Sequence, residues 1–300
     1  MEEKIVSKLG RTFFVNKNED KHFKDVLTHK SYQLRNLCFL RKCCPIRPII
    51  IDVGAHIGEN TIEYATWASK VYGFEPCISS FNLALKNIYY NQHHWNKKKW
   101  WWYLNSKGSL DMTARVNVYN VGLGNKKENV KMRHYTNSGH TQISEKGNEL
   151  VKIKTLDSYN YDAVDIIKMD VEGYELFVLE GAKQTIERCR PVIQLEVNET
   201  HLKNFNVKPE QLFNFFNDID DYLFVSYKGA LMEGYYKGSI GVSDYFFIPG
   251  DLYDVLDKKV LAEVRLSDRD RYRCGLIRNS RFYEWYKDVV INEDKILLRR

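Results

Sequence analysis

Short apolar runs and helix-like segments alternate near residue 50 of the 300-residue chain. Ile49–Val53 and Val71–Phe74 are apolar runs with β-branched residues, a pattern typical of strands buried on both faces. Between them, Gly54 and Gly58 bracket a tight turn, and Thr61–Lys70 has the composition of a helix. This order of strand, glycine turn, helix and strand predicts a nucleotide-binding βαβ unit.

The same alternation continues towards the C-terminus. Further strands are predicted at 116–121, 128–134, 151–154, 164–169, 191–197, 222–227 and 245–248. Further helices are predicted at 78–90, 174–179 (with helical residues up to 188) and 209–217. Because strands alternate with helices, the α/β sheet is expected to be mostly parallel. Ligands then bind beyond the carboxyl ends of the strands, at the point where the strand order reverses.

Charge and composition divide the chain into a basic N-terminal arm (1–46), an α/β domain (47–249, with an insertion at about 92–114) and a charged, helical C-terminal extension (250–300). The first 50 residues contain eleven basic and five acidic residues, which accounts for the whole net charge of +6. The favoured interpretation of the arm is a packing segment with a solvated basic face, and binding of an acidic partner is the alternative. In the insertion, Lys97–Tyr103 mixes lysines with aromatic residues, which would either pack on the body or stack on bases or sugar rings.

The sequence contains no sign of a membrane or metal protein. No apolar signal region follows the charged start, and no window approaches the roughly 20 apolar residues of a spanning helix. The six cysteines show no CxxC spacing, which argues against a zinc site and a disulfide framework. His93 and His94 lack a third ligand nearby and are expected to face solvent. We therefore expect a cytoplasmic protein with reduced thiols, no transmembrane segment and no metal.

Polar and glycine residues follow five of the predicted strands. These strand ends are Asp52–Gly58, Glu75, Gly122–Asn125, Asp170–Gly173 and Glu196. Because the carboxyl ends of parallel strands meet at one edge of a sheet, the five segments are the candidate active site.

The glycine turn after Asp52 differs from the dinucleotide-binding fingerprint. Gly54 and Gly58 are four residues apart, so the glycine that lets the backbone approach a pyrophosphate is missing. Glu75 ends the next strand, where a carboxylate accepts both hydroxyls of a ribose. The pair predicts a site for an adenosine ligand without phosphates, such as S-adenosylmethionine. The less favoured interpretation is that Asp52 only caps the turn and Glu75 is merely exposed.

Several of these stretches resemble the FkbM family of S-adenosylmethionine-dependent methyltransferases. They are Asp52–Gly58, Phe74–Pro76, Thr155–Asp157, Ile167–Glu175, Leu179–Ala182 and Pro191–Glu196. The Lys-x-Asp-x-Glu-Gly-x-Glu block from Lys168 to Glu175 is the most specific of them, and the resemblance covers about 49–248. It implies a class I, Rossmann-like fold with a seven-stranded sheet, and O-methylation of hydroxyls on sugars or polyketide-like metabolites. His56 departs from the family, which usually has Asn there.

The resemblance and the strand ends together give the candidate site residues. The expected cofactor-binding residues are Asp52, Gly54, Ala55, His56, Gly58, Thr61, Glu75, Pro76, Gly122, Leu123 and Asp170. The candidates for catalysis are Asp170, Glu172, Lys168, Glu196 and His140. Lys168 is on a buried strand, so its charge needs a carboxylate partner, for which Glu196 and Glu172 are the candidates. Glu175 is expected to complement the dipole of the helix that starts there.

The predicted function is O-methylation of a hydroxyl on a sugar, glycan or small metabolite, with S-adenosylmethionine as cofactor. A ribose 2′-O-methyltransferase acting on RNA is the first alternative, because of the basic arm and the Trp/Lys insertion, but nucleic acid is not the favoured partner. Base N-methylation is disfavoured because the strand that ends at Asp170 continues as Val-Glu-Gly and not as Pro-Pro-aromatic. A non-catalytic protein that keeps the fold for binding is the second alternative.

Overall fold

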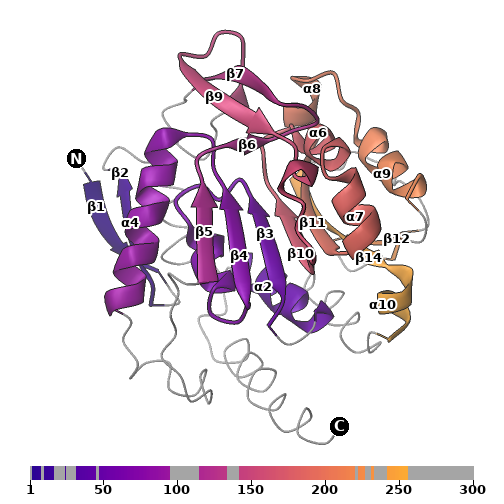
Figure 1. The fold of residues 1–300 in the computed structure, drawn as a ribbon, viewed down its shortest axis with the longest axis horizontal. Helices are drawn as coiled ribbons and strands as arrows, with labels where there is room; N and C mark the ends of the chain where they lie inside the picture. Colours follow the sequence, from indigo (N-terminus) through magenta and orange to yellow (C-terminus); the bar gives the residue numbers. More distant parts are fainter. Residues whose placement is uncertain are drawn as a thin grey trace, which may run out of the picture.

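The computed structural model describes residues 2–7, 10–16, 24, 32–44, 47–94, 115–133, 142–219, 222–226, 231–232 and 242–255. At its centre is a sheet in the order β13-β12-β14-β11-β10-β3-β4-β5 (Figure 1). The strands are β3 (Ile49–Val53), β4 (Lys70–Phe74), β5 (Val116–Tyr119), β10 (Ile166–Met169), β11 (Val192–Asn198), β12 (Tyr222–Ser226), β13 (Leu231–Met232) and β14 (Val242–Pro249). From β5 to β11 all neighbours are parallel, whereas β14 is antiparallel to β11 and β12. The seven strands from β12 to β5 confirm the predicted mostly parallel sheet, and β13 adds two residues at its edge.

The strand order reverses between β3 and β10. From β3 the chain moves outwards to β4 and β5, whereas from β10 it moves the other way to β11. Asp52 of β3 lies directly opposite Lys168 of β10 in the parallel register. The carboxyl ends of these two strands therefore form the switch point at which α/β sheets bind ligands.

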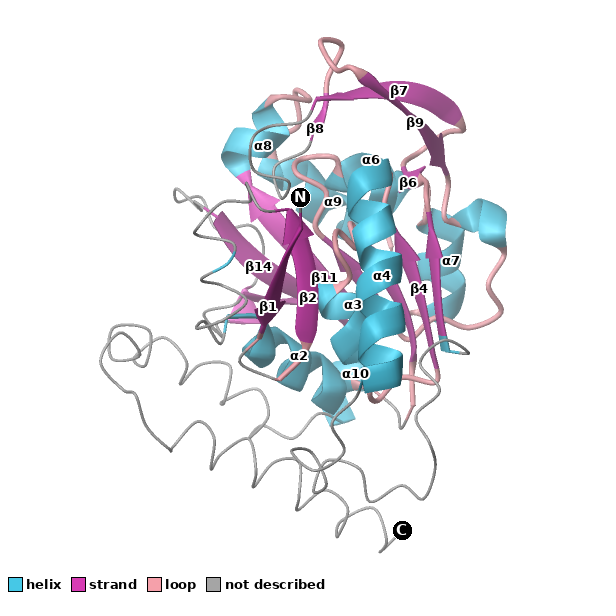
Figure 2. Ribbon diagram, turned by 90° about the vertical axis from the view of Figure 1, so that its left-hand side faces the viewer, coloured by secondary structure: helices cyan, strands magenta, loops and turns pink. Residues whose placement is uncertain are grey.

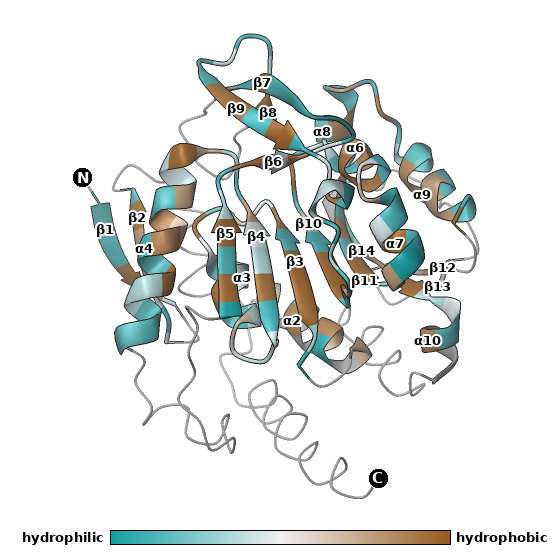
Figure 3. Cartoon of the chain, viewed as in Figure 1, coloured by the Kyte–Doolittle hydropathy of each residue, from teal (hydrophilic) through white to brown (hydrophobic). Residues whose placement is uncertain are grey.

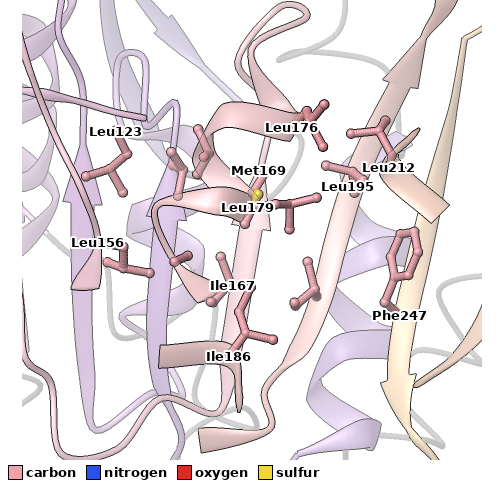
Figure 4. Packing of buried hydrophobic residues seen from close by; sticks show 14 of the residues in the cluster. Leu123, Leu156, Ile167, Met169, Leu176, Leu179, Ile186, Leu195, Leu212 and Phe247 are labelled. Atoms are coloured by element: carbon pink, nitrogen blue, oxygen red, sulfur yellow. The ribbon is translucent and has the colours of Figure 1, made fainter. Parts of the chain in front are cut away.

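Helices cover both faces of the sheet. Successive residues of a strand point to opposite faces, so each strand packs against both layers of helices. Ile50 is buried with α2 (Tyr32–Cys43), α3 (Glu59–Tyr64) and α4 (Ile78–His94), while Ile51 is buried with α6 (Glu175–Glu180), α7 (Lys183–Cys189) and α9 (Pro209–Asn217). Figure 3 shows β3 as an apolar strand in the middle of the molecule. Figure 4 shows the second face, where Ile167 and Met169 of β10 lie among side chains from α6, α7 and β11.

The predicted elements agree with the structure best where they are buried. The strand at 49–53 and the helix at 209–217 have the predicted bounds. The helix predicted at 61–70 ends at Tyr64 as α3, because the hydroxyl of Thr66 donates to the carbonyl of Glu63 and turns follow. In contrast, α4 continues to His94, and both terminal histidines are exposed as expected.

The described part of the N-terminal arm belongs to the folded body. Glu2–Val6 (β1) and Thr12–Asn16 (β2) form an antiparallel hairpin beside α4 (Figure 2). Phe13 and Val15 of this hairpin share one core cluster with Leu40 of α2 and Ile50 of β3. The hairpin was not among the predicted elements. The packing interpretation fits these residues, whereas the acidic-partner alternative stays a prediction.

A second sheet stands over the carboxyl edge of the first (Figure 1). Its order is β6-β9-β7-β8, with β6 at Gly122–Leu123, β7 at Glu128–Arg133, β8 at Gln142–Ile143 and β9 at Glu149–Lys154. The strands predicted near 128–134 and 151–154 are thus present, but they pair with each other. The remaining described elements are short: a 3-10 turn at Asp157–Tyr159, α8 at Glu199–Lys203 and α10 at Gly250–Val255.

Parts of the predicted insertion and C-terminal extension lie outside the described residues. Residues 95–114 of the insertion and 256–300 of the C-terminal extension are outside the described residues. Among the described helices, none combines the length and apolar character needed to cross a bilayer.

Candidate active site

The turn after β3 is held against the neighbouring strands. Gly54 and Ala55 both donate their backbone N–H groups to the carbonyl of Phe74, at distances of 3.0 and 3.1 Å. Gly54 has φ +78°, and a Cβ there would lie 2.0 Å from the carbonyl oxygen of Asp170. Only glycine fits, because any side chain would push β3 away from β10 at the switch point.

Glu75 is fixed beside this turn by the main chain. Its Oε2 accepts from the N–H of His56 and its Oε1 accepts from the N–H of Cys77, both at 2.9 Å. Burial raises the pKa of the Glu75 carboxyl, while His56 and the two backbone donors oppose that shift. A carboxylate with both oxygens oriented in this way still has lone pairs with which to accept hydroxyl donors.

His56 occupies a left-handed backbone position, with φ +48°. Asn and His are both enriched among the non-glycine residues that adopt this conformation. The replacement of the usual Asn by His56 is therefore compatible with the turn. The imidazole Nδ1 of His56 lies 3.6 Å from Oε1 of Glu59 in the first turn of α3.

Lys168 links the ends of β3 and β10. Its Nζ donates to the carbonyl of Gly54 at 3.2 Å and lies 3.5 Å from Oδ1 of Asp52 and 3.6 Å from Oδ2 of Asp170. The prediction that Glu196 or Glu172 is its partner was wrong. Lys168 lies beside Asp52 because β3 and β10 are neighbours in register, which the strand alternation alone does not specify.

Asp52 is an internal anchor. Its side chain is fully buried, and its Oδ2 accepts from the hydroxyl of Thr61 at 2.6 Å. Burial raises the pKa of Asp52, and Lys168 and Thr61 partly offset this shift. Although burial opposes its charge, Asp52 and Asp170 raise the pKa of Lys168 above its ordinary value. Asp170 is the outer member of the group, with 37% of its side chain exposed.

The loop after Asp170 prepares the start of α6. Glu175 is buried, and its Oε1 accepts from the N–H groups of Val171 and Gly173 at 3.2 and 3.1 Å. Burial raises its pKa to about 7. Glu175 lies in the first turn of α6 as predicted, but these bonds tie it to the loop before the helix, and its effect on the helix dipole stays a prediction.

Glu196 lies in a different chemical environment from Asp170. It is opposite Asp244 of β14, whose carboxylate accepts from Gln194 Nε2 at 3.2 Å and from Asn36 Nδ2 at 3.0 Å. Burial, followed by the charges of Asp170 and Asp244, raises the pKa of Glu196 to about 10. A carboxyl that holds its proton at neutral pH is a hydrogen-bond donor there and not a base.

The remaining predicted residues have identifiable positions. Gly122 and Leu123 form β6, where a Cβ on Gly122 would lie 2.6 Å from Cδ1 of Ile153 and Leu123 is buried. Gly58 precedes α3 with φ +87°, and the carbonyl of Pro76 accepts from Asn120 Nδ2 at 2.8 Å. His140 is outside the described residues.

Sequence reasoning missed His201 of α8. Its Nδ1 lies 2.6 Å from Oε2 of Glu172, so a histidine joins the loop that follows Asp170. The available signal was its position a few residues beyond Glu196, at a strand end already assigned to the site. In the part of the chain that the structure describes, no three His, Cys, Asp or Glu residues are grouped to hold a metal ion.

This strand order, with a glycine turn and an acidic strand end at its switch point, is a Rossmann-like α/β arrangement. Residues 52–232 match the family model described as methyltransferase FkbM domain. The chain belongs to the FkbM family of methyltransferases.

Several solved structures are similar to this chain at low sequence identity. The methyltransferase FkbM from Methylobacillus flagellatus KT has 19% identity and a TM-score of 0.43, and the match covers 67% of this chain and 43% of that one. An rRNA methylase from Streptococcus thermophilus has 10% identity and a TM-score of 0.40, with 72% and 94% covered. M. jannaschii TYW2 in complex with AdoMet has 14% identity and a TM-score of 0.40, with 82% and 86% covered.

The chain thus spans less than half the length of the Methylobacillus protein. A search of curated proteins gave no significant match.

Proposed function

We propose that this protein is an S-adenosylmethionine-dependent O-methyltransferase that acts on a hydroxyl group of a sugar, glycan or small metabolite. The observation that carries the proposal is the anchored carboxylate of Glu75 beside the Gly54 turn. The turn lacks the glycine pattern of a pyrophosphate site, and its carboxylate suits a ribose. These residues therefore fit an adenosine ligand without phosphates.

The residues that would hold this cofactor come from the switch point. Glu75 would accept the ribose hydroxyls, and the turn from Gly54 to Gly58 would supply backbone contacts. The turn would be kept in place by Asp52, Lys168 and Thr61, since Asp52 is fully buried and contacts the other two. When bound, the cofactor supplies an electrophilic methyl group on a sulfonium.

The chain's own residues would place the acceptor hydroxyl and take its proton. Asp170 is half-exposed at the tip of β10, where Lys168 orients its carboxylate at 3.6 Å. Glu172 follows two residues later. Correct alignment of two reacting groups contributes about 7 kcal/mol or more in favourable cases, and a general base adds roughly 10²–10⁴-fold. Of the predicted candidates, Asp170 and His140 keep a proposed role at the acceptor hydroxyl, whereas Glu172 and Lys168 are proposed to position other groups of the site. Glu196 is proposed as a neutral hydrogen-bond donor near the acceptor, because burial keeps it protonated.

Three described basic residues of the N-terminal arm bind within the protein, which argues against RNA as the acceptor. Arg11 forms a two-point ion pair with Glu63, at 2.7 and 3.1 Å. Lys24 contacts Glu3 at 2.5 Å, and Lys4 donates to the hydroxyl of Tyr90 at 2.6 Å. These side chains bind within the protein, whereas phosphate recognition needs basic groups turned towards solvent.

The experiment is transfer of a tritiated methyl group from S-adenosylmethionine to a panel of methyl glycosides, oligosaccharides and RNA. Calorimetry of S-adenosylmethionine binding runs beside it, with Glu75→Gln and with Glu187→Gln as a surface control. We expect label on a saccharide hydroxyl, and binding that weakens at least tenfold in Glu75→Gln alone. Label on RNA only would support the ribose alternative. Absence of cofactor binding by the unaltered chain would overturn the proposal and favour the non-catalytic alternative.

A further inference from the structure

A glutamate in the segment that follows the partly exposed Asp170 forms a close pair with a histidine. Nδ1 of His201 and Oε2 of Glu172 are 2.6 Å apart, and only 18% and 13% of the two side chains is exposed. Glu172 is in the specific Lys168–Glu175 block, whereas His201 comes from α8, after β11. The segments that follow β10 and β11 therefore contact each other through this pair.

The backbone of His201 is held by two further contacts. Oδ1 of Asn198 accepts from the N–H of Thr200 at 3.1 Å and from that of His201 at 3.3 Å, which caps α8. A Cβ at Gly173, which has φ +104°, would lie 2.4 Å from the carbonyl oxygen of His201. The loop after Asp170 therefore packs directly on α8, and glycine at 173 permits that approach.

The backbone of Glu172 is strained. Its φ is +56°, in the left-handed region that residues with a side chain seldom occupy. Such a conformation costs on the order of 1–3 kcal/mol and persists where the surroundings enforce it, often at active sites. The carboxylate of this residue is the one that lies 2.6 Å from Nδ1 of His201.

We propose that His201 is the general base that takes the proton of the acceptor hydroxyl, and that Glu172 is the positioning residue that orients it. This inference rests on the proposed function of the site. A carboxylate that accepts from Nδ1–H leaves Nε2 as the basic nitrogen of the ring, the arrangement that activates hydroxyl groups in other enzymes.

The proton and the electron pairs balance in this step. The acceptor oxygen forms the new C–O bond, the electron pair of the S–CH₃ bond stays on sulfur, and the hydroxyl proton passes to Nε2 of His201. The products are a methyl ether, a neutral thioether and an imidazolium paired with Glu172. No metal or oxidant is needed for this balance.

The surroundings of His201 set the pH at which it works. The bond to Glu172 raises its pKa, burial opposes this shift, and Glu175 and Asp170 add to the rise. Glu199 and Lys203 are the charged residues of α8 itself. Because a base must be unprotonated, the reaction rate is expected to rise with pH through a value above the ordinary 6.5 of histidine.

The pair is tested on the full chain by ¹⁵N NMR of the histidine side chains between pH 5 and 9. We expect neutral His201 in the Nδ1–H form, and a lower pKa of His201 in Glu172→Gln. Glu187→Gln, an exposed change on α7, serves as the control and should leave His201 unchanged. A neutral ring protonated at Nε2, or a titration that Glu172→Gln leaves unaltered, would overturn the proposal.

The catalytic role is tested with the tritiated-methyl assay on the saccharide that the unaltered chain labels best. His201→Gln should lower kcat about 10²–10³-fold while S-adenosylmethionine still binds within twofold. Glu172→Gln should shift the rising limb of the pH–rate profile to lower pH, which loss of a structural contact alone would not do. His93→Gln, in an exposed histidine, should change neither quantity. A kcat within threefold of the unaltered chain in His201→Gln would contradict the proposal.

The two proposals fail in different ways. If the unaltered chain labels no saccharide, the proposed acceptor is wrong, but the NMR titration still decides whether Glu172 sets the form of His201. If label appears and His201→Gln retains full activity, the O-methyltransferase stands and the base is another residue.

Discussion

Lys168 carries a positive charge in the core, where its Nζ lies within 3.6 Å of Asp52 and Asp170. Lys168→Met keeps a similar volume but leaves Asp52 buried without its charge partner. Removing one member of a buried ion pair typically costs about 3–5 kcal/mol, and we expect a loss of this size in urea unfolding.

The control for this change is Lys183→Met. Lys183 lies 3.9 Å from Glu187 on α7, and both side chains are about half exposed. An exposed pair of this kind contributes about 0.3–0.5 kcal/mol, so the control should unfold almost as the unaltered chain does. Equal losses in the two variants would show that the Lys168 group does not hold the strand ends together.

Glu196 gives the clearest dependence of stability on pH. Its pKa is raised from 4.5 to about 10 by burial, so the folded chain keeps a proton that the unfolded chain releases. Stability from this group is therefore fully present below pH 4.5 and declines as the pH rises towards 10. Glu196→Gln imitates the protonated form at every pH. Each pH unit above 4.5 changes the free energy of unfolding by about 1.4 kcal/mol, so we expect the variant to raise it by up to about 5 kcal/mol at pH 8 and to change it little at pH 4.5.

Urea midpoints at these two pH values measure the effect. The exposed Glu187→Gln should give no difference between them. A loss of stability in Glu196→Gln at pH 8 would mean that the carboxyl is ionised and paired in the folded chain.

At the residue scale, the sequence predicts which side chains reach the site but not which of them touch. Strand ends can be recognised in the sequence alone, and they predict the glycine turn, Glu75 and Asp170 as site residues. The partner of Lys168 depends on which strand lies next to β10, and Asp52 becomes its neighbour only through the pairing of β3 with β10. His201 was missed because it reaches Glu172 from a separate helix.

At the scale of elements, Gly54 and Gly58 allow a matched comparison. Both have a positive φ, but a Cβ at Gly54 would lie 2.0 Å from the carbonyl of Asp170, whereas one at Gly58 would meet its nearest atom, in Ala84, at 3.5 Å. Gly58→Ala should therefore cost only the backbone strain, about 1 kcal/mol. Gly54→Ala should cost at least about 3 kcal/mol, because β3 and β10 must also separate.

Thermal unfolding and calorimetry of S-adenosylmethionine binding check this comparison. We expect Gly54→Ala to weaken cofactor binding at least tenfold and Gly58→Ala to have a smaller effect. If the two variants behave alike, the close approach of the turn to Asp170 is not what makes glycine necessary.

Elements buried on both sides were predictable, and those that depend on a distant partner were not. Ile49–Val53 is an uninterrupted apolar run, and Pro209 marks the first turn of α9, so both have clear bounds. The strands of the hairpin are short, β1 begins with three charged residues, and both are stabilised by α4 and the core. Two strands of the second sheet were predicted from alternating apolar and polar residues, but this alternation does not predict that they lie above the main sheet.

At the scale of the whole molecule, Asn87 of α4 connects the N-terminal hairpin to the site. Its Oδ1 accepts from the N–H of Phe14 at 2.7 Å, and its Nδ2 donates to the carbonyls of Phe14 and Ile57 at 3.2 and 2.9 Å. One turn later, Asn91 bonds in the same way to both backbone groups of Thr12. The helix thus satisfies the edge of β2 as a neighbouring strand would, and it also holds the end of the glycine turn.

Asn87→Ala should therefore disturb two regions that are far apart in the sequence. It leaves a buried N–H at Phe14 and two carbonyls without this partner, and a buried group left unsatisfied costs about 1–3 kcal/mol. We expect a loss of about 2–4 kcal/mol in urea unfolding, faster hydrogen exchange at 12–16, and weaker S-adenosylmethionine binding through Ile57.

Asn82→Ala, on the exposed face of the same helix, is the matched control for loss of an asparagine. If exchange rises at 12–16 while cofactor affinity is unchanged, the hairpin supports the fold without supporting the turn. If neither changes, the hairpin is held by its apolar contacts with the core, in which Phe13 and Val15 would be the principal residues.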